Sequence, residues 1–138
     1  MPVVPMIAYV DGNAAMDWLI EAFGFTQHDR RNSASGTLTH GELETGGGII
    51  MIASATPDYQ SPKHHRETCV AARKWSSVPY IIDGVLVQVE HLNAHFARAR
   101  AAGAVMLSEP ENTPDGRHYR AEDLEGHRWM FEEIGISV

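Results

Sequence analysis

The sequence has a single cysteine, Cys69, so no disulfide can form within the chain. It contains no apolar run near the roughly 18 residues that a membrane-spanning helix requires. Its first five residues include no lysine or arginine, whereas a secretory signal begins with a basic segment. These absences predict a protein of the reducing cytoplasm, with neither disulfides nor a membrane partner.

Basic residues are also scarce. Lys and Arg number 11 against 18 Asp and Glu, which gives a formal net charge of −7. Proteins that bind nucleic acid need basic surface to neutralise phosphates. The charge balance therefore argues against a nucleic acid partner, and it is compatible with a cationic ligand.

A repeat with an offset of eighty residues runs through the sequence. The turn at residues 123–126, which leads into the apolar segment 127–132, has a weaker counterpart at residues 45–52. The same offset pairs Gly46 with Gly126, Gly36 with Gly116, Glu42 with Glu122, and Asp11 with His91. One offset at several separated places predicts two copies of a single supersecondary unit.

Periodicity and turn residues predict the same order of elements in both copies. In the first copy we expect strands at residues 6–10, 25–30, 37–43 and 49–53, and a helix at 14–23 that ends at Gly24. In the second copy we expect strands at residues 84–90, 104–107, 117–122 and 127–132, and a helix at 92–102. The predicted fold is α+β, with two βαβββ units that form a curved eight-stranded mixed sheet with a concave cleft.

The chain is expected to be one domain over residues 1–138, with units 1–53 and 81–138 joined by a connector at 54–80. The connector contains three prolines and about two turns of predicted helix at 67–74. A connector of this length is either a linker or a functional lid. Its place between the two copies favours the linker, and the lid stays as the alternative.

Segments 15–25 and 89–94, with the turn at 123–129, resemble the vicinal oxygen chelate superfamily. This superfamily includes glyoxalase I, bleomycin-resistance proteins and extradiol dioxygenases, and the resemblance is nearest to its PhnB-like branch. Leu124 stands where the family usually has proline. The resemblance implies the fold predicted above, a small-molecule ligand and a homodimer. It does not identify an activity, because this scaffold hosts unrelated functions.

Members of the superfamily that perform chemistry usually bind one divalent metal through His, Gln or Glu on the first and last strands of each unit. The corresponding positions here are Val4, Ile50, Gly84 and Met130. None of these side chains ligates such an ion. A two-residue slip offers Gln88 and Glu132, but the first-unit counterparts are then Ala8 and Ile52. The residues therefore predict no metal and no cofactor.

The resemblance implies that the cleft is lined by the strand face that carries Ile50, Gly84, Leu86 and Met130. The expected ligand-binding residues are His40, Trp75, Leu86, Gln88, Tyr119, Arg120, Met130 and Glu132. His40 is also the candidate catalytic residue, as a general base, although a position at the sheet edge is an equal alternative. Trp129 is expected in the core, His127 is expected to hold the closing turn, and His91 and His95 are expected at a solvated helix start.

Three interpretations of function follow. The first is a metal-free protein that binds a small molecule and sequesters a toxic or antibiotic compound. The second is a metal-dependent lyase, isomerase or dioxygenase with ligands in another register. The third is a non-catalytic dimeric module with a vestigial pocket. The apolar character of the predicted cleft favours the first.

Overall fold

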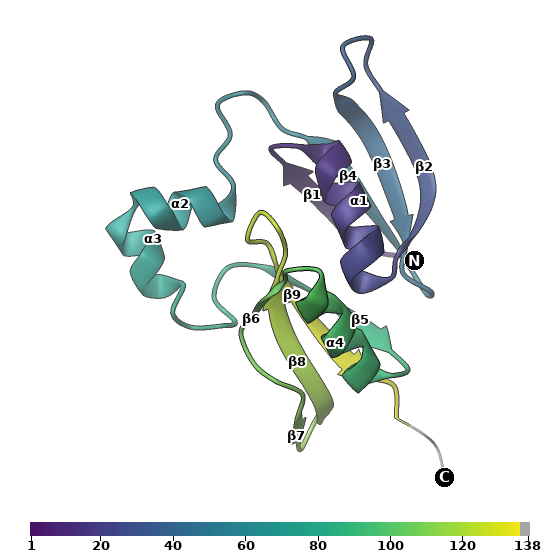
Figure 1. Cartoon of the computed structure of the whole chain (residues 1–138), viewed down its shortest axis with the longest axis vertical. Coiled ribbons are helices and arrows are strands. Elements are labelled where there is room, and N and C mark those ends of the chain that lie inside the picture. The colour runs from purple at the N-terminus through teal and green to yellow at the C-terminus, as the bar shows by residue number, and fades with distance from the viewer. Residues whose placement is uncertain (136–138) are drawn as a thin grey trace.

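The computed structural model describes residues 1–135 (Figure 1). The first unit contains β1 (Met6–Tyr9), α1 (Gly12–Phe23), β2 (Thr26–Asn32), β3 (Leu38–Glu44) and β4 (Ile49–Ser54). The connector contains α2 (Pro62–Thr68) and α3 (Val70–Trp75). The second unit contains β5 (Gly84–Val89), α4 (Leu92–Ala101), β6 (Val105–Met106), β7 (Glu111–Thr113), β8 (Gly116–Glu122) and β9 (Arg128–Glu133). The predicted order βαβββ is thus present twice, with the short β7 added to the second unit.

The strands of residues 1–135 form two hydrogen-bonded sheets, of four and five strands. The first sheet has the order β1-β4-β3-β2, and the second has the order β5-β9-β8-β6 with β7 paired to β8. In each sheet the first strand of the unit pairs with the last in parallel, and the other pairs are antiparallel. The α+β class is confirmed, and the mixed pairing of strands is repeated in both units.

Local capping explains why α1 has these bounds. The side chain of Asp11 accepts a hydrogen bond from the backbone N–H of Ala14, which satisfies a free donor in the first turn. Gly24 ends the helix in the left-handed conformation, with a φ of 75°, as the sequence predicts. No helix within residues 1–135 has the length and apolarity needed to cross a membrane.

The connector contains two short helices where one helix is predicted. Ser61 caps α2 through the N–H of His64, and Pro62 occupies the first turn. Cys69 then takes an extended conformation, with φ of −132° and ψ of 115°, and separates α2 from α3. Both helices lie to one side of the two sheets, as Figure 1 shows.

The two units pack through their helices. α1 contacts α4, and the indole N–H of Trp18 donates to the carbonyl of Ala102 at 2.9 Å. Aromatic rings from both units meet beneath the helices, where Phe23 contacts Trp129 and Phe131 edge to face. Trp129 is 1% exposed, so its predicted position in the core is confirmed.

His95 joins the two units, which corrects the expectation of a solvated position. Its Nδ1 lies 2.6 Å from the hydroxyl of Tyr119, and its Nε2 lies 2.9 Å from the carbonyl oxygen of Phe23. Because a carbonyl only accepts, Nε2 carries the proton and Nδ1 accepts from Tyr119. Burial lowers the pKa of His95, and nearby Arg98 acts in the same direction. The difference arises because the first unit covers this part of α4, which the spacing of residues along α4 does not reveal.

Candidate functional site

Each sheet has one face against its helix and an outer face on the other side. On β9, Trp129 and Phe131 are buried on the helix side, so Met130 and Glu132 belong to the outer face. Met130 lies opposite Leu86 on β5 and opposite Arg120 on β8. Leu86 is 53% exposed. The outer face of the second sheet therefore presents an apolar surface bordered by a guanidinium group.

A second row of side chains on this face is polar. Glu132 lies opposite Gln88 on one side and opposite His118 on the other. The amide of Gln88 donates to Oε1 of Glu132 at 3.2 Å. The Nδ1 atom of His118 is buried and, among the described residues, has no hydrogen-bond partner. This row offers a carboxylate, an amide and an imidazole for the orientation of a ligand on the apolar surface.

An open groove of about 870 Å³ runs along the edge of β5, between this strand, α4 and the first unit, and it reaches the outer face at Leu86 and Gln88. Leu86 and Gln88 line it from the second unit, and Val3, Pro5 and the turn at residues 45–48 line it from the first. Such a volume lies within the range of about 300–1,000 Å³ that is common for small-molecule sites. The groove and the outer face of the second sheet share Leu86 and Gln88, so they form one candidate site.

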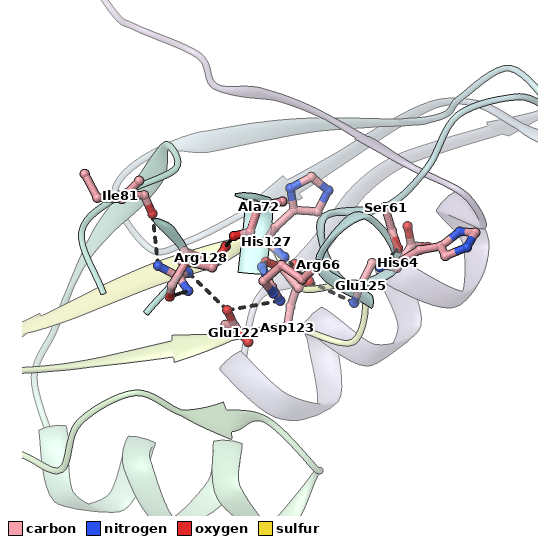
Figure 2. A network of polar contacts seen from close by, with 12 residues as sticks. Ser61, His64, Arg66, Ala72, Ile81, Glu122, Asp123, Glu125, His127 and Arg128 are labelled. Carbon is pink, nitrogen blue, oxygen red and sulfur yellow. Dashed lines mark hydrogen bonds and ion pairs between the residues drawn. The ribbon is translucent and has the colours of Figure 1, made fainter. Parts of the chain in front are cut away.

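A cluster of charged residues attaches the connector to the end of the second sheet. Figure 2 shows the carboxylate of Glu122 between Arg66 and Arg128, at 3.1 and 3.0 Å. Arg128 also donates to the backbone carbonyls of Ser76, Val78 and Ile81, at 2.6, 2.7 and 3.0 Å. The side chains of Glu122 and Arg128 are only 9% and 5% exposed. The connector is therefore held at the end of the outer face where β9 begins.

The first sheet also has an outer face, and its alternation differs from the prediction. Ile50 is 2% exposed and points toward α1, whereas its neighbour Met51 lies on the outer face beside Glu42. β9 begins two residues after Gly126, but β4 begins three residues after Gly46. The extra residue in the glycine turn moves every side chain of β4 to the opposite face.

The predicted ligand-binding residues fall into three groups in the structure. Leu86, Gln88, Arg120, Met130 and Glu132 lie together on the outer face of the second sheet. His40 lies on β3 in the other sheet, and Trp75 lies on α3, where its ring contacts His65. Tyr119 is fully buried against α4, because it occupies the helix side of β8, and it does not border the site.

The positions that the resemblance assigns to a metal do not fit one. Val4 precedes β1, and Gly84 is the first residue of β5 and has no side chain. Ile50 is buried in the core, and Met130 offers only a thioether. Divalent ions of this kind prefer imidazole and carboxylate donors. The structure therefore gives no basis for a metal at the first- and last-strand positions.

Sequence reasoning missed two groups of polar residues on the outer faces. One is His118, which the sequence patterns do not single out, although it stands two residues before Arg120 and must share its strand face. The other is the pair Asp29 and Glu42, whose side chains lie close to His40 in the structure. The alternation of β3 places His40 and Glu42 on one face, but only the pairing with β2 adds Asp29.

Comparisons with known proteins agree with this architecture. The family model described as Glyoxalase/Bleomycin resistance protein/Dioxygenase superfamily matches residues 3–131. The crystal structure of TioX from Micromonospora sp. ML1 is 33% identical, with a TM-score of 0.71, and the match covers 100% of this chain and 99% of that one. No curated protein matches the chain.

Two more distant structures share the fold. The bleomycin-binding protein from bleomycin-producing Streptomyces verticillus, complexed with copper(II)-bleomycin, is 16% identical with a TM-score of 0.62. The match covers 98% of this chain and 97% of that one. TnmS3, an antibiotic binding protein from Streptomyces sp. CB03234, is 16% identical with a TM-score of 0.60, and 98% of each chain is covered.

Proposed function

Because the chain belongs to the glyoxalase/bleomycin resistance protein/dioxygenase superfamily, we propose that it binds a small organic molecule on the outer face of its second sheet. The observation that carries this proposal is the continuity of the groove with the surface of Leu86, Met130 and Gln88. Side chains hold the ligand directly, without a metal at the first- and last-strand positions. Sequestration of a toxic or antibiotic compound is the role that we propose for this binding.

The proposal draws support from proteins of the same fold that bind such compounds. One is called a bleomycin-binding protein and another an antibiotic binding protein. In this chain, the carboxylate of Glu132 and the net charge of −7 favour a ligand with hydrogen-bond donors or positive charge. Leu86 and Met130 would contact its apolar part.

We further propose that the chain is a cytoplasmic protein of the PhnB-like branch, that it folds as one domain, and that it forms a homodimer. β1 and β5 are edge strands of their sheets. Met6 and Leu86, one on each of these strands, are 78% and 53% exposed. Exposed apolar side chains on open strand edges favour association with a second copy. Sedimentation of the chain and of Met6→Glu tests this, because Met6 lies outside the ligand site and loss of dimer in the variant supports burial of the β1 edge.

The binding proposal is tested with a library of antibiotics and cationic aromatic compounds in a thermal-shift assay, followed by calorimetry on each compound that stabilises the chain. A ligand that prefers the folded state raises the melting temperature with its concentration. Leu86→Asp should abolish binding and Glu132→Gln should weaken it. The matched control is Glu67→Gln on α2, which removes the same charge away from the site.

Two results would contradict the proposal. One is the absence of saturable binding across the library, which would favour a module with a vestigial pocket. The other is a ligand whose affinity is unchanged in Leu86→Asp, which would place the site elsewhere.

A further inference from the structure

Three potential metal ligands meet on the outer face of the first sheet. Asp29 lies on β2, and His40 and Glu42 lie on β3. One ligand atom from each side chain lies within 4.8 Å of the other two. The Nε2 atom of His40 is 3.7 Å from Oε2 of Glu42.

Strand pairing brings these side chains to one face. His40 and Glu42 are two residues apart on β3, so they point to the same side of the sheet. Asp29 is directly opposite Glu42, because the register of β2 shifts between Gln27 and Asp29. The side chains of Asp29, His40 and Glu42 are 36%, 25% and 26% exposed, so the group is partly shielded from solvent.

The arrangement is costly without a cation. Asp29 and Glu42 place two carboxylates opposite each other on neighbouring strands, and like charges in this position destabilise a sheet. Arg31 offsets part of this repulsion, with Nε 3.0 Å from Oδ2 of Asp29. However, the Arg31 side chain is 66% exposed, so solvent screens its ion pair with Asp29.

We propose that Asp29, His40 and Glu42 form a binding site for a divalent transition metal, with Zn²⁺ as the best match. An imidazole and two carboxylates are typical ligands of Zn²⁺, with bonds of about 2.0–2.2 Å. Adjacent donors around a tetrahedral ion are then about 3.3–3.6 Å apart, so the side chains need only rotamer adjustments of about 1 Å. Three protein ligands leave a fourth position open for water or for a donor atom of a bound compound.

This site differs from the metal positions that the resemblance implies. Those positions lie just before β1 and on β4, β5 and β9, whereas Asp29, His40 and Glu42 lie on β2 and β3. The expectation of a protein without a metal does not weigh Asp29, His40 and Glu42 together. The site stands on its own residues and does not depend on the ligand proposed for the second sheet.

The test is calorimetric titration of the full chain with Zn²⁺ alone. We expect saturable binding, in which one Zn²⁺ ion per chain occupies this site. His40→Gln and Glu42→Gln should each weaken that site at least about tenfold, since even outer-shell changes commonly cost that much. Two controls match these variants, Glu44→Gln on the same strand and His28→Gln on the neighbouring strand, and both should leave the affinity unchanged.

The proposal is overturned if Zn²⁺ shows no saturable binding, or if His40→Gln and Glu42→Gln bind it as tightly as the controls do. Circular dichroism of each variant establishes that it is folded. Asp29→Asn serves as a third variant if either of the others does not fold, and it should weaken binding to the same extent.

Discussion

The hydroxyl group of Tyr9 donates a hydrogen bond to Oδ2 of Asp123 at 2.6 Å, across 114 positions of sequence. The same oxygen accepts from the indole N–H of Trp129 at 3.0 Å. The other carboxylate oxygen, Oδ1, accepts from the backbone N–H groups of Glu125 and His127, each at 3.0 Å. Asp123 therefore holds the closing turn of the second unit and ties it to the first strand of the first unit.

Removal of the Tyr9 hydroxyl should destabilise the fold. Burial and the neighbouring Asp123 carboxylate raise the pKa of Tyr9 well above its ordinary value, so the hydroxyl remains a donor at all ordinary pH values. Tyr9→Phe should lower the free energy of unfolding by about 1–3 kcal/mol, because a buried carboxylate loses a donor. Tyr80→Phe, in a side chain that is 71% exposed, should change it by less than about 0.5 kcal/mol. Equal effects in urea denaturation would contradict a role for this bond.

The duplicated glycines Gly46 and Gly126 should respond unequally to alanine. Their φ angles are 97° and 87°, so alanine is strained at both, by about 1–2 kcal/mol. A Cβ at Gly126 would also lie 2.5 Å from Nη2 of Arg66 and 2.7 Å from the backbone nitrogen of Lys63, whereas none of the described atoms lies within 4 Å at Gly46. Gly126→Ala should therefore cost at least about 1 kcal/mol more than Gly46→Ala. Denaturation of the two variants measures this difference. Similar losses of unfolding free energy would indicate that Arg66 and Lys63 of the connector do not pack against Gly126.

Arg128 should control the order of the connector next to the candidate site. Replacement by methionine leaves Glu122 and three backbone carbonyls without this donor. Arg128→Met should lower the free energy of unfolding by about 3–5 kcal/mol. Hydrogen exchange should rise at residues 76–81, with Arg31→Met as an exposed control of the same size. Unchanged exchange in Arg128→Met would show that the connector is held by other contacts.

The stability of the fold should fall in mild acid because of His95. Its pKa is lowered in the folded state by burial, so the unfolded chain binds more protons below the ordinary histidine pKa of about 6.5. Stability contributed by the neutral ring is complete above that pH and is lost as the pH falls toward the folded value. Between pH 7.5 and 5.5, the free energy of unfolding from urea denaturation should decrease less in His95→Gln than in the parent chain, by up to about 1 kcal/mol.

The control for this measurement is His91→Gln, because the side chain of His91 is exposed at the N-cap of the same helix, α4. It should retain the pH dependence of the parent chain. An identical pH dependence in His95→Gln and the parent would mean that other groups cause the acid sensitivity.

Much of the fold could be predicted from short-range patterns. Asp11 and Gly24 mark the ends of α1, and alternation identifies the strands on either side of the glycine turns. The grouping of Leu86, Gln88, Met130 and Glu132 on one strand face also follows from alternation and parallel pairing. These features depend on residues close in sequence, or on a repeat that is visible in it.

The position of Ile50 could not be obtained in this way. Its face depends on how many residues the glycine turn uses before β4 begins, and the repeat alone does not reveal one extra residue. The burial of Tyr119 and His95 likewise depends on the contact between α1 and α4, which joins residues of different units.

By itself, the sequence determined the two βαβββ units, their helix ends and the charge of the chain, because these follow from local geometry and composition. Only the tertiary structure decided that the side chain of Asp29 lies beside those of His40 and Glu42. It also decided that Arg128 binds the connector backbone and that Asp123 accepts a hydrogen bond from Tyr9. Each of these contacts joins strands or loops that are separate in the sequence, and their separation in the sequence does not predict their distance in space. The physical reason is that register and packing are settled by burial of the whole core, which no single segment encodes.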